Sequence, residues 1–181
     1  MTLDNVLYFS DNQITTQDVL DEIALAISMS GCPLHCKGCH SSFTWDPKFG
    51  EELTNDKLEQ LIKKNKYISC VLFYGGEWRM NRLMELIGIV KNHSLKVCLY
   101  TGLMLEEIVK TKMELLSVLD YIKVGRWIEE KGGLNKKTTN QRFYKVVNNG
   151  IGEQKQSPSY EVIEINDNIK LIDWTSRFFQ S

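Results

Sequence analysis

Short apolar segments alternate with amphipathic segments between residues 23 and 124, and this alternation restricts the fold more than any other feature of the sequence. The apolar segments have the length of strands and no polar face, as expected for strands covered on both sides; they span 23–29, 68–74, 95–100 and 121–124. The segments between them have apolar residues at helical spacing: Leu58, Leu61 and Ile62 behind a start at Thr54, then Leu83, Leu86, Ile87 and Val90, then the stretch 105–119.

Strand, helix, strand, helix in this order predicts an α/β fold with a parallel sheet, covering helices and right-handed crossovers. A closed eight-fold barrel typically needs about 250 residues, and the chain has 181. We therefore expect an open, partial (β/α) barrel in a single domain, 1–181, with a core of about 20–147. Two later segments, 142–147 and 160–165, are candidate strands, 129–137 and 148–158 are candidate loops, and no role is assigned to the extension 148–181.

Composition narrows the class of protein. With 43% hydrophobic and 25% charged residues, the chain has enough apolar material for the core of one soluble domain. A net charge of -1 gives no overall field for nucleic acid, and no apolar run approaches the ~18 residues of a membrane span. The first residues lack the basic start and apolar stretch of a secretory signal, so we expect a cytoplasmic protein with reduced thiols.

Three of the five cysteines stand within eight residues, directly after the first predicted strand. Cys32, Cys36 and Cys39 are separated by three and then two residues, and Pro33 and Gly38 allow the tight backbone path by which three thiolates reach one soft centre. Structural zinc usually takes four protein ligands, whereas a cubic iron–sulfur cluster held by three cysteines keeps one iron open for a substrate. The triplet thus predicts a metal or cluster site.

Zinc stays open at this point, because His35 or His40 can complete a Cys3His site. A disulfide framework is disfavoured, since the number of cysteines is odd and the chain is not a small cysteine-rich domain. Cys70 and Cys98 lie in apolar segments and are predicted to be small buried core residues.

Glycines and polar residues follow the predicted parallel strands, at the edge where ligands bind in such sheets. In Gly75-Gly76-Glu77 the glycines let the backbone approach a bound group, and the carboxylate can accept charge-assisted hydrogen bonds from an amine. Thr101 follows the third strand, and Arg126 follows the fourth, where it can contact an anionic cofactor. Taken alone, these residues also suit a turn and a surface arginine. Alternation does not tell which side of the sheet Lys123 faces.

The cysteine triplet after the first strand, with Gly75-Gly76-Glu77 after the second, resembles the radical S-adenosylmethionine superfamily. Within it, four details are similar to the small activases of class III anaerobic ribonucleotide reductase. They are Gly31 before the first cysteine, Gly38 where most members have an aromatic residue, the stretch 42–45, and the stretch 138–142. The resemblance covers about 23–142.

The resemblance implies that Cys32, Cys36 and Cys39 hold a [4Fe–4S] cluster whose open iron binds the amino and carboxylate groups of S-adenosylmethionine. Gly75, Gly76 and Glu77 would bind this cofactor, with Glu77 near its amino group, and Thr101 and Arg126 complete the expected cofactor-binding residues. One electron from a low-potential donor such as a flavodoxin would cleave the cofactor to methionine and a 5′-deoxyadenosyl radical. That radical would take a hydrogen atom from a backbone glycine of the large subunit of an anaerobic ribonucleotide reductase.

Two positions depart from the family pattern. Trp78 stands where a proline is common, and Val124 stands where an Asp-Gly pair often begins the motif at the end of the fourth strand. Two other functions also stay open. One is a radical S-adenosylmethionine enzyme that acts on a free metabolite, and the other is a non-catalytic zinc module.

Overall fold

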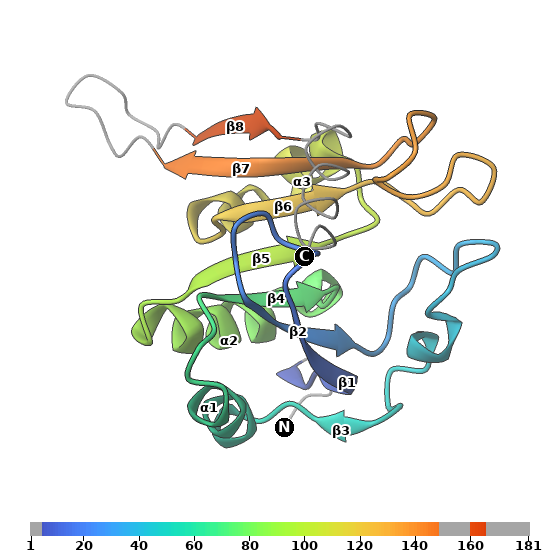
Figure 1. Ribbon diagram of the computed structural model, residues 1–181. Helices are drawn as coiled ribbons and strands as arrows, with labels where there is room; N and C mark the ends of the chain where they lie inside the picture. The colour runs from blue at the N-terminus through green and yellow to red at the C-terminus, as the bar shows by residue number, and fades with distance from the viewer. Residues whose placement is uncertain (1–4, 149–159, 166–181) are drawn as a thin grey trace, which may run out of the picture.

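One eight-stranded sheet organises the residues that the computed structural model describes, 5–148 and 160–165 (Figure 1). The strands lie in the order β3-β1-β2-β4-β5-β6-β7-β8. Their bounds are β1 Tyr8–Thr15, β2 Ala24–Met29, β3 Glu51–Glu52, β4 Cys70–Tyr74, β5 Lys96–Tyr100, β6 Tyr121–Val124, β7 Arg142–Asn148 and β8 Tyr160–Glu164. The helices are α1 Asn55–Lys64, α2 Met80–Asn92 and α3 Leu105–Thr111, with 3-10 turns η2 Ser42–Trp45, η3 Glu77–Arg79 and η4 Met113–Ser117.

The four predicted apolar strands form the parallel centre of this sheet. β2 pairs with β4, β4 with β5 and β5 with β6, all in parallel, so their carboxyl ends meet at one edge. The two later strand predictions are confirmed as β7 and β8. The sheet is mixed, because β1 and β3 on one side and β7 and β8 on the other are antiparallel to their neighbours.

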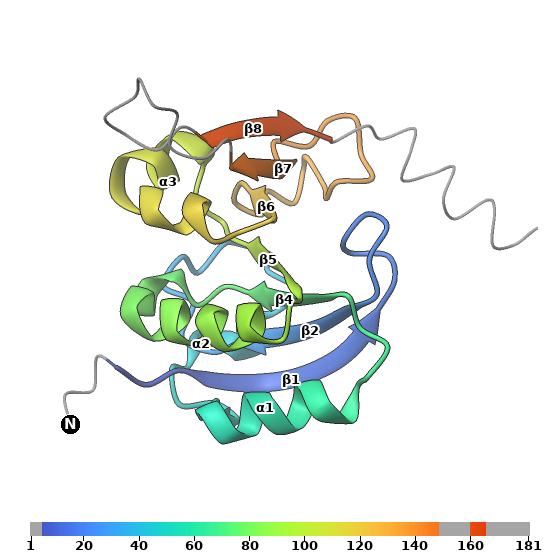
Figure 2. The ribbon, with the colours of Figure 1, turned by 90° about the vertical axis from the view of Figure 1, so that its left-hand side faces the viewer.

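The predicted helices cover one face of the sheet. Figure 2 shows α1, α2 and α3 one after another, from the β1 side toward β6 and β7. The hydroxyl of Thr54 accepts a hydrogen bond from the backbone N–H of Lys57 at 3.1 Å and begins α1 where the sequence predicts it. The apolar faces of α1 and α2 are buried against every second residue of the parallel strands, in a core that includes Leu58, Leu83, Val71, Leu99 and Ile122.

The prediction of one helix over 105–119 is wrong in part. The backbone N–H of Lys112 bonds to the carbonyl of Ile108 and closes α3, and Lys112 itself leaves the helical region at φ -147°. The chain then resumes as the 3-10 turn η4. This break lets Leu115 and Leu116, which are neighbours in sequence, both be buried.

The opposite face of the parallel strands is covered by the connection between β1 and β2. Val19 in this connection is 1% exposed and packs with Ala26, Cys70 and Cys98, and the Tyr100 hydroxyl donates to the backbone carbonyl of Asp18. The prediction that Cys70 and Cys98 are buried core residues is therefore confirmed. The N-terminal segment, to which the sequence assigned no element, supplies both β1 and this cover.

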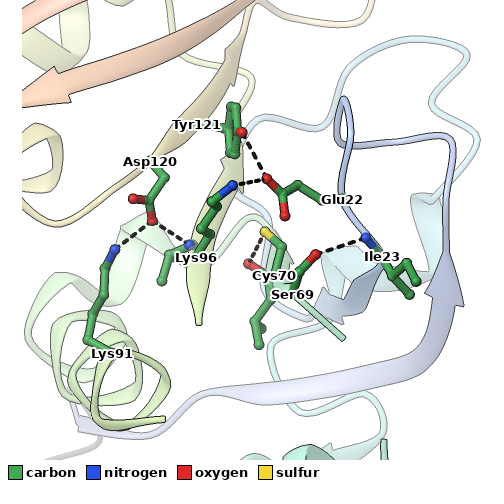
Figure 3. Close-up of polar contacts among 10 residues, drawn as sticks. Glu22, Ile23, Ser69, Cys70, Lys91, Lys96, Asp120 and Tyr121 are labelled. Carbon is green, nitrogen blue, oxygen red and sulfur yellow. Dashed lines mark hydrogen bonds and ion pairs between the residues drawn. The ribbon is translucent and has the colours of Figure 1, made fainter. Parts of the chain in front are cut away.

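The amino edge of the parallel strands is held by a dense polar network (Figure 3). The Glu22 carboxylate accepts from Lys96 and from the Tyr121 hydroxyl, the latter at 2.9 Å, and Asp120 accepts from Lys91 Nζ at 2.5 Å and from the backbone N–H of Val97 at 2.7 Å. Burial alone would raise the pKa of Glu22, but the hydrogen bonds from Lys96, Ser69 and Tyr121 hold it below its usual value.

The sheet is open in the described part of the chain, since β3 and β8 are its two ends and do not pair with each other. The predicted loop 129–137 consists of turns and bends. Of the expected extension 148–181, only Asn148, which ends β7, and 160–165 are described; the loop 149–158 and the residues after 165 lie outside the described residues. No helix among the described residues is long and apolar enough to span a membrane.

Candidate functional site

The cysteine loop leaves β2 at its carboxyl end and folds back on itself. The backbone N–H groups of Gly31 and Cys32 both donate to the carbonyl of Thr44, at 2.6 and 3.3 Å, and the N–H of Cys39 donates to the carbonyl of Cys36 at 3.1 Å. Cys32, Cys36 and Cys39 are free thiols and partly buried. Burial raises the pKa of Cys32, a hydrogen bond with the backbone of Leu34 lowers it, and the charge of the Glu77 carboxylate raises it further.

Glu77 is the most confined charged group at this edge. Gly75 and Gly76 both adopt positive φ, +87° and +107°, and turn the chain so that the Glu77 side chain is 4% exposed. The Thr101 hydroxyl donates to Oε1 at 2.5 Å, and Oε2 is buried without a hydrogen-bond partner. Burial raises the pKa of this carboxyl, although the Thr101 bond lowers it. A buried carboxylate oxygen without a donor suits an incoming ammonium group.

Thr101 acts through Glu77 in this structure. Its hydroxyl donates to Glu77 and also accepts from the backbone N–H of Leu103 at 3.0 Å, which fixes the direction of its O–H bond. The sequence selected Thr101 only by its place after β5. The structure brings it together with Glu77, from the neighbouring strand end.

Two glycines make room for Trp78, the residue that departs from the family pattern. A Cβ at Gly75 would lie 2.4 Å from Cη2 of the Trp78 ring, and one at Gly31 would lie 3.1 Å from Trp78 Nε1. The indole thus occupies space that two glycines leave free, between the cysteine loop and the loop after β4. It fixes one loop against the other.

Arg126 is the predicted site residue whose side chain the structure does not bring to Glu77 or the thiols. Its guanidinium is half-exposed and lies 3.9 Å from the Glu107 carboxylate of α3. Its backbone does border the site: the Arg126 carbonyl accepts from Asn140 Nδ2 at 3.0 Å, and a Cβ at Gly102 would lie 3.8 Å from the Arg126 Cα and 2.3 Å from a methyl group of Leu34. The stretch 138–142 therefore supports the loop after β6.

The two histidines of the cysteine loop pack on tryptophan rings. His35 stacks on Trp45 with ring centroids 4.6 Å apart, and His40 contacts Trp127 at 4.5 Å. Among the described residues, no group of three or more His, Cys, Asp or Glu side chains converges as ligands of one metal ion. Among these residues, the thiols of Cys32, Cys36 and Cys39 are thus not gathered around one centre, either with an imidazole or without one.

Three features of this edge were not predicted. Lys123 lies beside Tyr100, a pocket of about 310 Å³ is lined by Gln13, Ser28, Ser41, Thr44 and Tyr74, and Trp127 packs on the cysteine loop. The alternation of β6 narrows Lys123 to one of two faces but does not choose between them. The pocket includes Gln13 of β1, a strand without a clear sequence pattern.

Comparison with known proteins defines the class. Residues 23–147, which include the cysteine loop and the parallel strands, match the family model of the 4Fe-4S single cluster domain. The chain belongs to this family, which favours a cluster over zinc at Cys32, Cys36 and Cys39. It is also similar to a Vibrio cholerae serotype O1 protein named anaerobic ribonucleoside-triphosphate reductase-activating protein, with 26% identity over 113 residues that cover 57% of this chain and 73% of that protein. The resemblance to such activases is thereby confirmed.

Proposed function

We propose that this chain is a radical S-adenosylmethionine activase that generates a glycyl radical on the large subunit of an anaerobic ribonucleotide reductase. Cys32, Cys36 and Cys39 hold the [4Fe–4S] cluster, and residues 20–147 form the core of a single catalytic domain with the open, partial barrel of that superfamily. A low-potential donor such as a flavodoxin supplies the electron, and the reaction takes place in the cytoplasm. The similarity, at 26% identity, to a protein named as a reductase-activating protein supports the reductase as the partner.

The observation that carries this proposal is the carboxylate of Glu77. This carboxylate is buried, its charge raises the pKa of Cys32, and one of its oxygens has no hydrogen-bond donor. When bound, the cluster and S-adenosylmethionine supply a one-electron cleavage of a carbon–sulfur bond, which gives a radical able to take a hydrogen atom. Glu77 contributes by accepting hydrogen bonds from the cofactor's ammonium group, and Thr101 orients Glu77.

The remaining predicted residues position the cofactor and shield the site. Gly75 and Gly76 keep the backbone close to the cofactor, since their positive φ values put no side chain in its way. Trp78 fills the space that Gly31 and Gly75 leave between the cysteine loop and the loop after β4. Arg126 borders the site through its backbone. Its guanidinium pairs with Glu107 and therefore has at most a secondary role in cofactor binding.

The open sheet supports a protein as substrate. Because β3 and β8 are unpaired ends among the described strands, one side of the barrel has no wall of its own. A reactive radical needs a closed site before it forms. A docked reductase closes the site and brings its glycine to it.

One experiment tests the proposal with a matched control. Anaerobically reconstituted wild type, Glu77→Gln and Glu106→Gln are compared for bound iron and sulfide, for the Kd of S-adenosylmethionine, and for a glycine-centred doublet in electron paramagnetic resonance with a cognate reductase. Glu77→Gln should keep the cluster and bind the cofactor about five- to tenfold more weakly, because a charge-assisted bond of roughly 1.5–3 kcal/mol is exchanged for a neutral bond of roughly 0.5–1.5 kcal/mol. The exposed Glu106 serves as the control for lost charge.

The same experiment separates the alternatives. The polar pocket of about 310 Å³ is the one feature that favours a free metabolite as substrate. Deuterium transfer from a small molecule into 5′-deoxyadenosine, without any glycine doublet, would establish that alternative and refute the activase. Zinc without iron or sulfide in the reconstituted protein would refute both.

A further inference from the structure

Tyr74 ends β4, and its side chain lies on the side of the sheet that the helices do not cover. The preceding Phe73 belongs to the core beneath the helices, whereas Tyr74 packs against the other core cluster, which contains Leu72. Its ring meets the ring of Tyr100, the residue paired with it on β5, edge to face at a centroid distance of 5.1 Å. The phenol therefore has a fixed place at the carboxyl edge, directly before the loop 75–77.

The pocket of about 310 Å³ connects this phenol with the cysteine loop. Its lining includes Tyr74 and, from the segment directly after the cysteine triplet, Ser41 and Thr44. The Thr44 carbonyl accepts a hydrogen bond from the backbone N–H of Cys32 at 3.3 Å, so this part of the lining is attached to the start of the cysteine loop. The pocket therefore borders both the end of β4 and the proposed cluster ligands.

Tyr74 differs in chemistry from the other described residues that line the pocket. Their side chains carry amide or alcohol groups with strong N–H and O–H bonds; they are Gln13, Ser28, Ser41 and Thr44. A phenolic O–H bond is weaker, because the ring delocalises the unpaired electron that is left on oxygen. It is also weaker than the C–H bond that a primary carbon radical forms when it takes a hydrogen atom. Burial raises the pKa of Tyr74, and the neighbouring Asp18 carboxylate raises it further, so the phenol keeps its hydrogen at neutral pH.

We propose that Tyr74 is an internal hydrogen-atom donor that quenches the 5′-deoxyadenosyl radical when no protein substrate is docked. This inference rests on the cofactor cleavage of the proposed function and adds a second fate for its radical. The O–H bond of Tyr74 breaks and a C–H bond forms at the 5′ carbon, which gives 5′-deoxyadenosine and a neutral tyrosyl radical. One electron from the low-potential donor and one proton from water then restore the phenol. A radical formed at an open site is thereby kept from attacking other side chains.

The test uses the whole chain with its reconstituted cluster, equilibrated in heavy water so that its phenolic hydrogens are exchanged, with S-adenosylmethionine and a thiol-free reductant. Without reductase, wild type should form 5′-deoxyadenosine that carries one deuterium at the 5′ carbon, and Tyr74→Phe should lose most of this label. Tyr67→Phe is the matched control and should keep the label, because Tyr67 is 90% exposed and precedes β4 at the amino edge. A cognate reductase should replace the labelled product by unlabelled product, since the hydrogen of a glycine α carbon does not exchange with water.

Electron paramagnetic resonance of the same samples, frozen during turnover, gives a readout that does not depend on the product. Wild type without reductase should show a tyrosyl signal that narrows when the protein contains ring-deuterated tyrosine. Tyr74→Phe should not show this signal, and Tyr67→Phe should show it unchanged.

Two results would overturn the inference. One is unlabelled 5′-deoxyadenosine from wild type in heavy water without reductase. The other is an undiminished label in Tyr74→Phe with full iron and sulfide content, which would assign the hydrogen to a different donor. If the Phe variant does not keep its cluster, Tyr74→Leu is measured against the same criteria, and absence of the tyrosyl signal from wild type also decides against the inference. A wild type that holds its cluster but forms no 5′-deoxyadenosine at all would instead refute the proposed function.

Discussion

The two edges of the parallel sheet are built on opposite principles. At the amino edge, Glu22 and Asp120 each accept hydrogen bonds from more than one donor. At the carboxyl edge lie all four buried side-chain atoms that have no hydrogen-bond partner in the described part of the chain; they are Trp45 Nε1, Glu77 Oε2, Trp127 Nε1 and Asn140 Oδ1. One edge satisfies these buried carboxylates by itself, and the other leaves four buried polar atoms without a partner among the described residues.

The difference indicates which edge of the sheet stabilises the fold and which edge is suited to ligand binding and chemistry. Buried groups without partners cost stability, and they persist where a ligand supplies the missing bonds. In barrels of parallel strands, the amino edge serves stability and the carboxyl edge serves function. Substitutions at the two edges should therefore act with opposite signs.

The largest effect is expected at the cysteine loop. Replacing Cys32, Cys36 or Cys39 by Ala should abolish bound iron and activity together, because each thiolate is a ligand of a three-cysteine site. Cys70→Ala, in the core, should retain the cluster and lose about 1–2 kcal/mol of folding free energy through lost packing. Iron and sulfide analysis and denaturant unfolding measure both quantities. A triple Ala variant that still binds iron stoichiometrically would contradict the assignment.

The second effect concerns the amino edge. Glu22→Gln should lower the free energy of unfolding by about 2 kcal/mol, since a buried carboxylate that accepts from Lys96 and Tyr121 becomes a neutral amide. Urea denaturation of the apoprotein gives the value. Bound iron and cofactor affinity should not change, and a change in either would mean that the two edges are coupled.

The third effect has the opposite sign. Glu77→Gln should raise the free energy of unfolding of the apoprotein by about 1 kcal/mol at neutral pH, because a buried charge with an unpartnered oxygen is removed while the Thr101 bond can remain. The same denaturation series measures it beside Glu22→Gln. A clear loss of stability would show that Glu77 serves the fold more than the site.

The pH dependence of stability sharpens this contrast. The pKa of Glu22 is lowered in the folded state, so its contribution is full above the ordinary value of 4.5 and is lost as pH falls through the folded pKa. The pKa of Glu77 is raised, so its contribution is full below 4.5 and is lost as pH rises through the folded pKa. Glu22→Gln should weaken the acid dependence of unfolding. Glu77→Gln should remove a loss of stability on the other side of 4.5, and matching profiles for the two variants would contradict both assignments.

The smallest effect is expected at Arg126. Arg126→Ala should change stability by less than about 0.5 kcal/mol, because its ion pair with Glu107 is half-exposed and 3.9 Å long. Cofactor affinity should fall by no more than a few-fold. A tenfold loss, measured by equilibrium dialysis, would place the guanidinium at the cofactor after all.

The sequence predicted the parts of the fold that depend on local patterns. Apolar runs located β2, β4, β5 and β6, and the side chain of Thr54 located the start of α1. It did not predict β1, because Tyr8–Thr15 lies near the sheet's edge and only Phe9 in it is buried. Nor did it predict the break at Lys112, where no Gly or Pro marks the end of the helix.

The site divides in the same way. Cysteine spacing and Gly75-Gly76-Glu77 are local signals, and the structure places both segments after neighbouring parallel strands, β2 and β4. The bond between Thr101 and Glu77 joins residues 24 positions apart, and Lys96 and Glu22 are 74 positions apart. Such contacts depend on the order of the strands in the sheet, which cannot be read from a single sequence. The exposed guanidinium of Arg126 illustrates the reverse: a correct strand end does not fix where a long side chain points.

Trp78 constrains the order in which this chain can change over evolution. With the indole in place, any side chain at Gly75 would meet the ring at 2.4 Å, and one at Gly31 would crowd Nε1. The three positions therefore form one epistatic unit that spans two loops. A smaller residue at 78 would relieve the contact with the ring, but a side chain at Gly31 would still lie 3.1 Å from Pro47 Cβ, and both glycines keep positive φ. A larger residue at either glycine is therefore accommodated only together with a change at Trp78, and even then it meets a strained backbone.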